Sequence, residues 1–255
     1  MARAQCCAAP TMAPATERMD SFLNTRAWIF DLDNTLYPAS SNLFAQIDQR
    51  MGEFIAGYLD LPFDEAHVLQ KSYYVSYGTT LSGLMIEHDL KPEKFLDYVH
   101  DIDVSMLTPS PELASAIEAL PGEKYIFTNG SRKHAENVAG RLGVLDKFDD
   151  VFDIGAAGFV PKPDAKAYDL FLKAHDVTAH EAAMFEDMPH NLQVPHALEM
   201  VTVLVHSEFY DHPVQRQIKE WTAPPAHVHH MTDDLLGFLG EVNGVLDAKP
   251  NEDPH

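Results

Sequence analysis

The 255 residues of this chain are 45% hydrophobic and 22% charged, which is typical of a globular protein long enough to bury a sizeable core. Acidic residues outnumber basic ones by 39 to 18, and the formal net charge of -21 disfavours nucleic acid polymers and anionic membrane surfaces as partners. The sequence contains no run of the roughly 18 apolar residues that a membrane span needs. Such a protein can still bind a small anionic ligand if a metal ion or a lysine offsets the negative charge at the binding site.

Residues 1–24 lack the continuous apolar centre that a secretory signal requires. We expect them to form a disordered extension. This extension holds the only two cysteines, Cys6 and Cys7, which are adjacent and have the spacing of neither a useful disulfide nor a zinc site. The rest of the chain is free of cysteine. This composition favours a reducing compartment, and we expect a cytoplasmic protein.

Beyond the extension, apolar β-favouring runs alternate with segments of helical period. The predicted strands are residues 28–32, 125–128, 182–185 and 201–205. Apolar residues with helical spacing occupy 112–120 and 168–175. The alternation predicts an α/β fold, a Rossmann-like parallel sheet with helices on both faces. In such a sheet the ligand binds beyond the carboxyl ends of the strands.

About ninety residues separate the first two predicted strands, far more than a crossover needs, so this interval must fold by itself. Residues 41–104 are rich in helix formers and aromatics, and we expect an all-helical cap of three to five helices that lies over the strand ends. The core then comprises residues 25–40 and 105–240, with a short helix at 235–239. Residues 241–255 are expected to be a disordered tail.

Polar clusters follow three of the predicted strands. In DLDNT, the carboxylate of Asp31 can attack phosphorus to form an acyl phosphate that water hydrolyses. Asp33, two residues on, can protonate the leaving oxygen and later accept a proton from water. A solvated turn at a strand end would carry the same acids, so this motif alone leaves both explanations open.

The second and third clusters are FTNGS and PKP. The hydroxyl of Thr128 and the following backbone N–H groups form an anion site, although Ser131 would serve equally well as a helix N-cap. Lys162 stands between two prolines that stiffen the backbone. Its ammonium can screen a nucleophile from a phosphate, or it can be an exposed lysine in a turn.

The fourth cluster is FEDMPHN. Glu186 and Asp187 suit Mg²⁺, a hard cation that takes oxygen ligands, and Asn191 can hydrogen-bond a water on the ion. A helix start with acids that favour its dipole is the structural alternative. Taken together, a phosphate and the ionised Asp31, Glu186 and Asp187 share a pocket only if Mg²⁺ and Lys162 offset their repulsion.

The ordered set DLDNT, FTNGS, PKP and FEDMPHN resembles the four motifs of the haloacid dehalogenase superfamily. The longer strings FDLDNTLYPASSNLF, YGTTLSGLM, FTNGSRKHAENV and FVPKPDAKAYDLF are similar to its pyrimidine 5′-nucleotidase branch. The resemblance implies a Mg²⁺-dependent phosphomonoesterase that forms an aspartyl phosphate and hydrolyses pyrimidine 5′-nucleoside monophosphates.

The same resemblance implies a role for each matching residue. Asp31 is the nucleophile, Asp33 the general acid and base, and Lys162 the charge stabiliser. The other implied residues are the phosphate ligands Thr128 and Asn129, the metal ligands Asp31, Asp33 through its backbone carbonyl, and Asp187, and the supporting residues Glu186 and Asn191. Many relatives carry an aspartate where Asn191 stands.

Three alternatives follow from the same residues. Sugar phosphates or other small phosphorylated metabolites would use the same chemistry. A 2-haloacid dehalogenase is less expected, because dehalogenating members attack carbon and typically lack an acid at the position of Asp33. A non-catalytic sensor of phosphorylated ligands is disfavoured because all four chemical positions are intact. The sequence favours neither a monomer nor a dimer.

Overall fold

The computed structural model describes residues 19–207 and 216–248, and its centre is a six-stranded sheet with the order β3-β2-β1-β4-β5-β6. Every neighbouring pair of strands is parallel. The strands are β1 (Ala27–Phe30), β2 (Glu123–Phe127), β3 (Asp150–Phe152), β4 (Ala182–Glu186), β5 (Val201–Val205) and β6 (His230–Thr232). The predicted Rossmann-like parallel sheet is confirmed, and β3 and β6 are additional to the four predicted strands.

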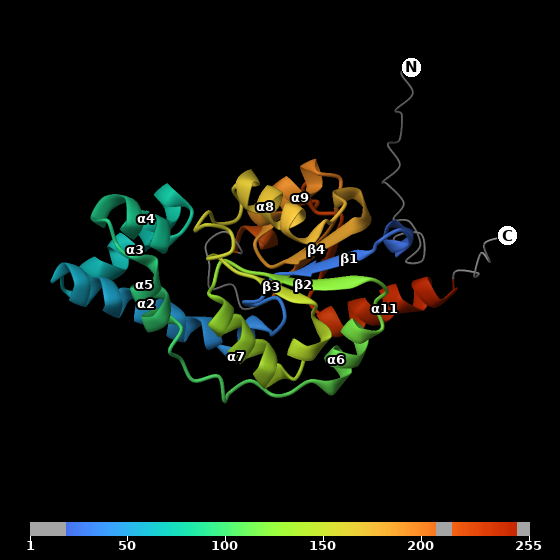
Figure 1. Ribbon diagram of the computed structural model, residues 1–255, viewed down its shortest axis with the longest axis horizontal. Helices are drawn as coiled ribbons and strands as arrows, with labels where there is room; N and C mark the ends of the chain where they lie inside the picture. Colours follow the sequence, from blue (N-terminus) through green and yellow to red (C-terminus); the bar gives the residue numbers. More distant parts are fainter. Residues whose placement is uncertain (1–18, 208–215, 249–255) are drawn as a thin grey trace, which may run out of the picture.

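Helices cover both faces of the sheet (Figure 1). One face carries α8 (Ala165–His175) and α9 (Gln193–Ala197), and the other carries α6 (Pro111–Glu118), α7 (Arg132–Leu142) and α11 (Leu235–Ala248). Successive strand residues point to opposite faces. Trp28 and Phe30 of β1 therefore enter the core under α6, α7 and α11, whereas Ile29 enters the core under α8. All four residues of β1 are buried, as expected for a strand covered on both sides.

Four helices lie between β1 and β2 in the chain and form the unit that we call the cap. They are α2 (Leu43–Leu59), α3 (Phe63–Tyr77), α4 (Thr80–His88) and α5 (Pro92–Val99). The cap has its own apolar core, which includes Ile55, Tyr73 and Phe95 and also receives Ile154 from the sheet domain. Gly83 permits this packing, because a Cβ there would lie 2.4 Å from the ring of Tyr73. Figure 1 places the cap at one end of the sheet.

The structure corrects the predicted N-terminal extension at its inner end. Residues 19–24 were assigned to a disordered segment, but Met19 is buried and Phe22 is completely buried. The ring of Phe22 stacks on Trp28 at 5.8 Å and meets Phe238 edge-on at 5.9 Å. An aromatic side chain with two such partners buries enough surface to order the residues around it. Residues 1–18, which include Cys6 and Cys7, lie outside the described part of the chain.

The structure also corrects the predicted C-terminal tail, which was placed at residues 241–255. The helix α11 continues to Ala248, because Leu235, Leu239 and Val242 repeat with helical spacing and are buried against the sheet domain. Asn243 Nδ2 adds a hydrogen bond to the Ala116 carbonyl at 2.9 Å. Residues 249–255 are outside the described part. Among the described helices, none combines the length and apolar character required to cross a bilayer.

We expect Phe22→Ala to lower the free energy of unfolding by about 3–5 kcal/mol, because it leaves a cavity between Trp28 and Phe238. Urea unfolding followed by circular dichroism would measure the change. The control is Val75→Ala on the outer face of α3, where the side chain is 82% exposed and the expected loss is below about 0.5 kcal/mol. If the two variants lost the same free energy of unfolding, the packing of residues 19–24 against the sheet domain would be contradicted.

Candidate active site

The motif residues meet where β1, β2 and β4 end. Asp31 directly follows β1, and its backbone N–H donates to the Phe185 carbonyl at 2.9 Å, which extends the ladder with β4 by one bond. Asn34 then adopts a left-handed conformation, with φ of 59°, and turns the chain back. A cavity of about 450 Å³ lies between these loops and the cap. Its lining includes all eight predicted site residues: Asp31, Asp33, Thr128, Asn129, Lys162, Glu186, Asp187 and Asn191.

Lys162 is 2% exposed and lies at the centre of the site. Its Nζ donates to Asp31 Oδ1 at 2.7 Å, to Glu186 Oε1 at 2.8 Å and to the Phe127 carbonyl at 2.8 Å. All three ammonium hydrogens are therefore used. Burial lowers the pKa of Lys162, but the charges of Asp31 and Glu186 outweigh burial and raise the pKa above its ordinary value. The ammonium thus stays charged at neutral pH.

Asn129 and Thr128 make different contacts at the end of β2. Asn129 Oδ1 accepts the backbone N–H of Lys162 at 2.8 Å, and its Nδ2 donates to the Lys162 carbonyl at 3.2 Å. The Asn129 side chain therefore holds the backbone of Lys162. Asn129 can still donate its second amide hydrogen and its backbone N–H to a phosphate. Thr128 Oγ1 accepts the N–H of Gly130 at 2.9 Å, which leaves its hydroxyl proton for an anion.

Asp33 is held by two groups that sequence reasoning did not assign to it. Its Oδ1 accepts from Tyr37 Oη at 2.6 Å and from His134 Nε2 at 2.9 Å. Burial alone would raise the pKa of Asp33, but His134 and the Tyr37 hydrogen bond outweigh burial and lower it, so the carboxylate is ionised. His134 is on the first turn of α7, 101 residues from Asp33 in the chain. Its place three residues after the N-cap Ser131 is the only local sign that it faces the strand ends.

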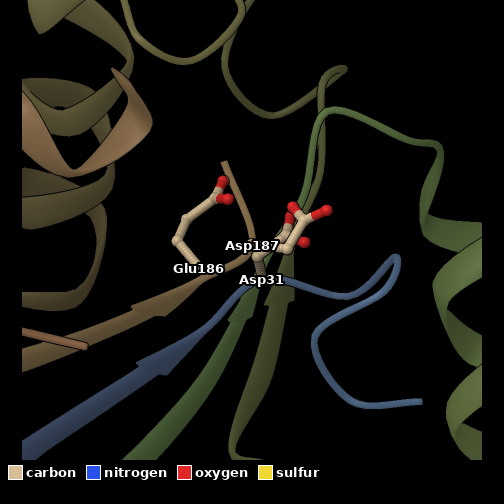
Figure 2. Close-up of side chains that lie close together, drawn as sticks. All are labelled: Asp31, Glu186 and Asp187. Atoms are coloured by element: carbon tan, nitrogen blue, oxygen red, sulfur yellow. The ribbon is translucent and has the colours of Figure 1, made fainter. Parts of the chain in front are cut away.

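The carboxyl groups of Asp31, Glu186 and Asp187 offer oxygens that all lie within 4.8 Å of one another. Figure 2 shows the three side chains directed beyond the ends of β1 and β4. Burial raises the pKa of Asp31 to about 7, against the opposing charge of Lys162. Burial and the charges of Glu186 and Asp31 also raise the pKa of Asp187 well above its ordinary value. One ammonium thus does not balance three ionised carboxylates, and two of the three carboxyl groups respond with a raised pKa.

The residues present fit a hard divalent cation. Both carboxylate oxygens of Glu186 already accept hydrogen bonds from the protein. Its Oε1 accepts from Lys162 Nζ and, at 2.6 Å, from Asn191 Nδ2. Its Oε2 accepts the backbone N–H of Met188 at 2.7 Å. Asp31 and Asp187 remain as carboxylate ligands of the kind that Mg²⁺ prefers. Asn191 Oδ1 is buried and, within the described residues, receives no hydrogen bond, so a water on such an ion would satisfy it.

Other polar side chains lie in or near the cavity. Asn42 and Thr80 line the cavity, whereas Ser40 and Tyr77 do not, and Tyr77 instead contacts Glu87. Two of the three histidines in HVHHM, residues 227–231, contact other side chains. His229 Nε2 lies 3.1 Å from His196 Nδ1, and His230 Nε2 lies 2.9 Å from Ser21 Oγ. In the described chain, the acidic trio above is the one group of three metal-ligating side chains that lie together.

This parallel sheet, with its carboxylates and buried lysine at the strand ends, defines the class of protein. Residues 25–197 match the haloacid dehalogenase-like hydrolase family, and the chain belongs to it. A relative in Saccharomyces cerevisiae, "Phosphate metabolism protein 8", is 28% identical over 179 residues, which are 64% of this chain and 55% of that protein. The chain therefore spans about half the length of that relative.

Three solved structures share the fold. A HAD phosphatase from Thermococcus onnurineus is 18% identical with a TM-score of 0.56, over 87% of this chain and 98% of that one. The HAD-hydrolase YfnB from Bacillus subtilis, bound to magnesium, is 14% identical with a TM-score of 0.54, over 88% and 99%. The L-2-haloacid dehalogenase from Xanthobacter autotrophicus is 16% identical with a TM-score of 0.52, over 88% and 99%. Phosphatase and dehalogenase structures match about equally well, so the fold alone does not separate the two chemistries.

We expect Lys162→Met to cost about 3–5 kcal/mol of stability, because it leaves Asp31 and Glu186 buried without their cation. The loss should be larger at pH 8 than at pH 5. Without the ammonium, the pKa values of both acids in the folded protein lie above their unfolded values, so stability falls as the pH rises through them. Urea unfolding of metal-free protein at the two pH values measures this.

The matched control for this variant is Lys173→Met. The side chain of Lys173 is 72% exposed and pairs with Asp169 on the surface of α8, so a change below about 0.5 kcal/mol is expected at either pH. A loss in Lys162→Met that does not depend on pH would contradict the assigned charge balance and indicate a packing defect.

Proposed function

We propose that this protein is a Mg²⁺-dependent phosphomonoesterase that acts through an aspartyl-phosphate intermediate, with pyrimidine 5′-nucleoside monophosphates as substrates. The observation that carries the proposal is the position of Asp33, which lines the same cavity as Asp31 and is oriented by Tyr37 and His134. A departing alkoxide needs a proton, whereas a departing halide does not. An acid held in this place favours ester hydrolysis over dehalogenation.

In the first chemical step, a carboxylate oxygen of Asp31 attacks phosphorus as the bond to the ester oxygen breaks. Lys162 and Thr35 orient the nucleophile, since Asp31 Oδ1 accepts from Lys162 and Oδ2 accepts from Thr35 Oγ1 at 3.2 Å. The Thr128 hydroxyl donates to a phosphoryl oxygen. Bound Mg²⁺, held by Asp31, Asp187 and the Asp33 carbonyl, would offset the charge of the phosphate.

Asp33 moves the proton in both steps. The surroundings of Asp33 favour its ionised form, but a phosphate dianion beside it would raise its pKa, so we infer that substrate binding is accompanied by proton uptake. Asp33 then gives this proton to the leaving alcohol and takes one from the water that cleaves the aspartyl phosphate. Tyr37 and His134 both bind Oδ1, which keeps Oδ2 for these transfers.

The cavity supports a leaving group of nucleoside size. Its volume of about 450 Å³ lies in the range of pockets that enclose small organic molecules. Phe44, Met51, Leu96 and Val99 give its cap side an apolar surface that suits a base better than a ring of hydroxyls. The pyrimidine preference comes from the resemblance of the motif strings, and the name of the yeast relative associates that protein with phosphate metabolism.

We expect strong Mg²⁺-dependent phosphate release from UMP, CMP and dTMP, weaker release from AMP, GMP, sugar phosphates and pyridoxal phosphate, and a loss of at least about a thousandfold in Asp31→Asn. A colorimetric phosphate assay with and without EDTA measures all of these. The control is Asp176→Asn at the end of α8, where the left-handed backbone, with φ of 53°, tolerates asparagine. It should keep the parent activity.

Other outcomes of this assay distinguish the alternatives. Activity confined to sugar phosphates would keep the mechanism and replace the substrate. Halide release from a 2-haloacid that is insensitive to chelator would contradict the phosphatase. Tight binding of UMP with no turnover of any ester would favour a sensor.

We expect saturating Mg²⁺ to raise the melting temperature of the parent by roughly 5–10 °C, and Asp187→Asn to abolish this shift because it removes a ligand.

Metal-free Asp187→Asn should also be more stable than the parent at pH 8. The folded-state pKa of Asp187 lies above its unfolded value, so the parent loses stability as the pH rises and the amide does not. Differential scanning fluorimetry measures both effects, with Asp176→Asn as control; an undiminished Mg²⁺ shift in Asp187→Asn would contradict the ligand assignment.

A further inference from the structure

His100 lies outside every motif but lines the active-site cavity. It is the C-cap of α5, where the chain leaves the cap and returns to the sheet domain. Its ring stacks on His134 with centroids 4.4 Å apart and planes 11° from parallel. His134 is the residue that holds Asp33, so the catalytic acid and His100 share one rigid support.

The contact with Ser131 favours one tautomer of His100. Ser131 Oγ accepts the backbone N–H of His134 as the N-cap of α7 and lies 2.9 Å from His100 Nδ1. When Nδ1 accepts the hydroxyl proton, both groups are satisfied and the single proton of the neutral ring lies on Nε2. Burial and the neighbouring His134 lower the pKa of His100 to about 3, which keeps the ring neutral.

The Nε2 atom is close to Thr128, the residue proposed to bind phosphate. A Cβ on residue 130 would lie 3.3 Å from Thr128 Oγ1 and 3.6 Å from His100 Nε2, so the hydroxyl and the ring nitrogen flank the same glycine. Nε2 forms no hydrogen bond with any group in the described residues. The cavity wall thus carries a neutral N–H donor without a protein acceptor, close to the hydroxyl expected to bind phosphate.

We propose that His100 Nε2–H binds a neutral oxygen of the leaving group near the ester oxygen, and thereby orients the departing alcohol toward Asp33. This inference rests on the proposed phosphatase activity. It selects phosphate esters of polyols, such as the ribose of a nucleotide with its ring and hydroxyl oxygens, over esters whose only nearby oxygen is the ester oxygen. His100 is then a substrate-binding residue that the cap contributes.

Two variants separate substrate binding from support of His134. His100→Phe keeps a flat ring against His134 but removes the donor, and His100→Gln restores an N–H at a similar reach. With UMP, His100→Phe should lower kcat/KM roughly threefold to tenfold, mainly through KM, the effect of one neutral hydrogen bond. His100→Gln should recover part of this loss.

The comparison substrate is p-nitrophenyl phosphate, which has no oxygen adjacent to the ester. Its kcat/KM should change less than about twofold in His100→Phe, because the proposed hydrogen bond is absent in the parent as well. Equal losses on both substrates would overturn the inference and assign His100 to holding the pair of His134 and Asp33. An unchanged kcat/KM for UMP would also overturn it.

A measurement without turnover tests the inference separately from the proposed function. In Asp31→Asn protein with ¹⁵N-labelled histidine, the His100 ring should show an unprotonated Nδ1 and a protonated Nε2, and the Nε2–H signal should shift when UMP is added. A proton on Nδ1, or a signal that UMP leaves in place, would overturn the inference. Failure of the parent to release phosphate from either ester would contradict the proposed function, and the UMP titration would still decide the role of His100.

Discussion

The ammonium of Lys162 is the contact on which the rest of the site depends. It touches Asp31 after β1, the Phe127 carbonyl at the end of β2 and Glu186 at the end of β4, so one buried charge joins three neighbouring strands. Without this ammonium, the buried carboxylates at the ends of β1 and β4 would repel one another strongly, because the protein interior screens charges poorly. Asn129 holds both backbone polar groups of this lysine, which explains why the amide faces the lysine loop.

A second network connects Asp33, the proposed general acid, to the cap. His134 binds Asp33 and stacks on His100, and Ser131 contacts both histidines. Ile154, from the loop after β3, packs into the apolar core of the cap. His100, proposed to bind the leaving group, and Asp33, proposed to protonate it, are therefore held against a common residue, which is the arrangement that proton transfer at a defined position requires.

Local patterns predicted much of this structure, and they failed for short elements and for contacts between distant residues. Apolar runs placed β1, β4 and β5 because fully buried parallel strands read as continuous hydrophobic segments. The three residues of β3 are too few for such a signal. Phe22 and the contact of His134 with Asp33 were missed because their partners lie far away in the chain. Asn129 was recognised as a site residue, but its hydrogen bonds to Lys162 depend on where two distant loops meet.

Within this family the fold is shared by proteins that attack carbon and proteins that attack phosphorus, so the choice of chemistry depends on single side chains. In the proposed mechanism, Asp33 is the side chain that decides between the two chemistries. Its hydrogen bonds with Tyr37 and His134 favour the ionised form, which is the base that the proposed hydrolytic step needs. The acid form is needed only while an ester is bound, and the bound dianion is itself the charge that favours protonation. In this proposal, the same electrostatic repulsion that makes a pocket of carboxylates costly favours the protonated form of Asp33 at the step that uses the proton.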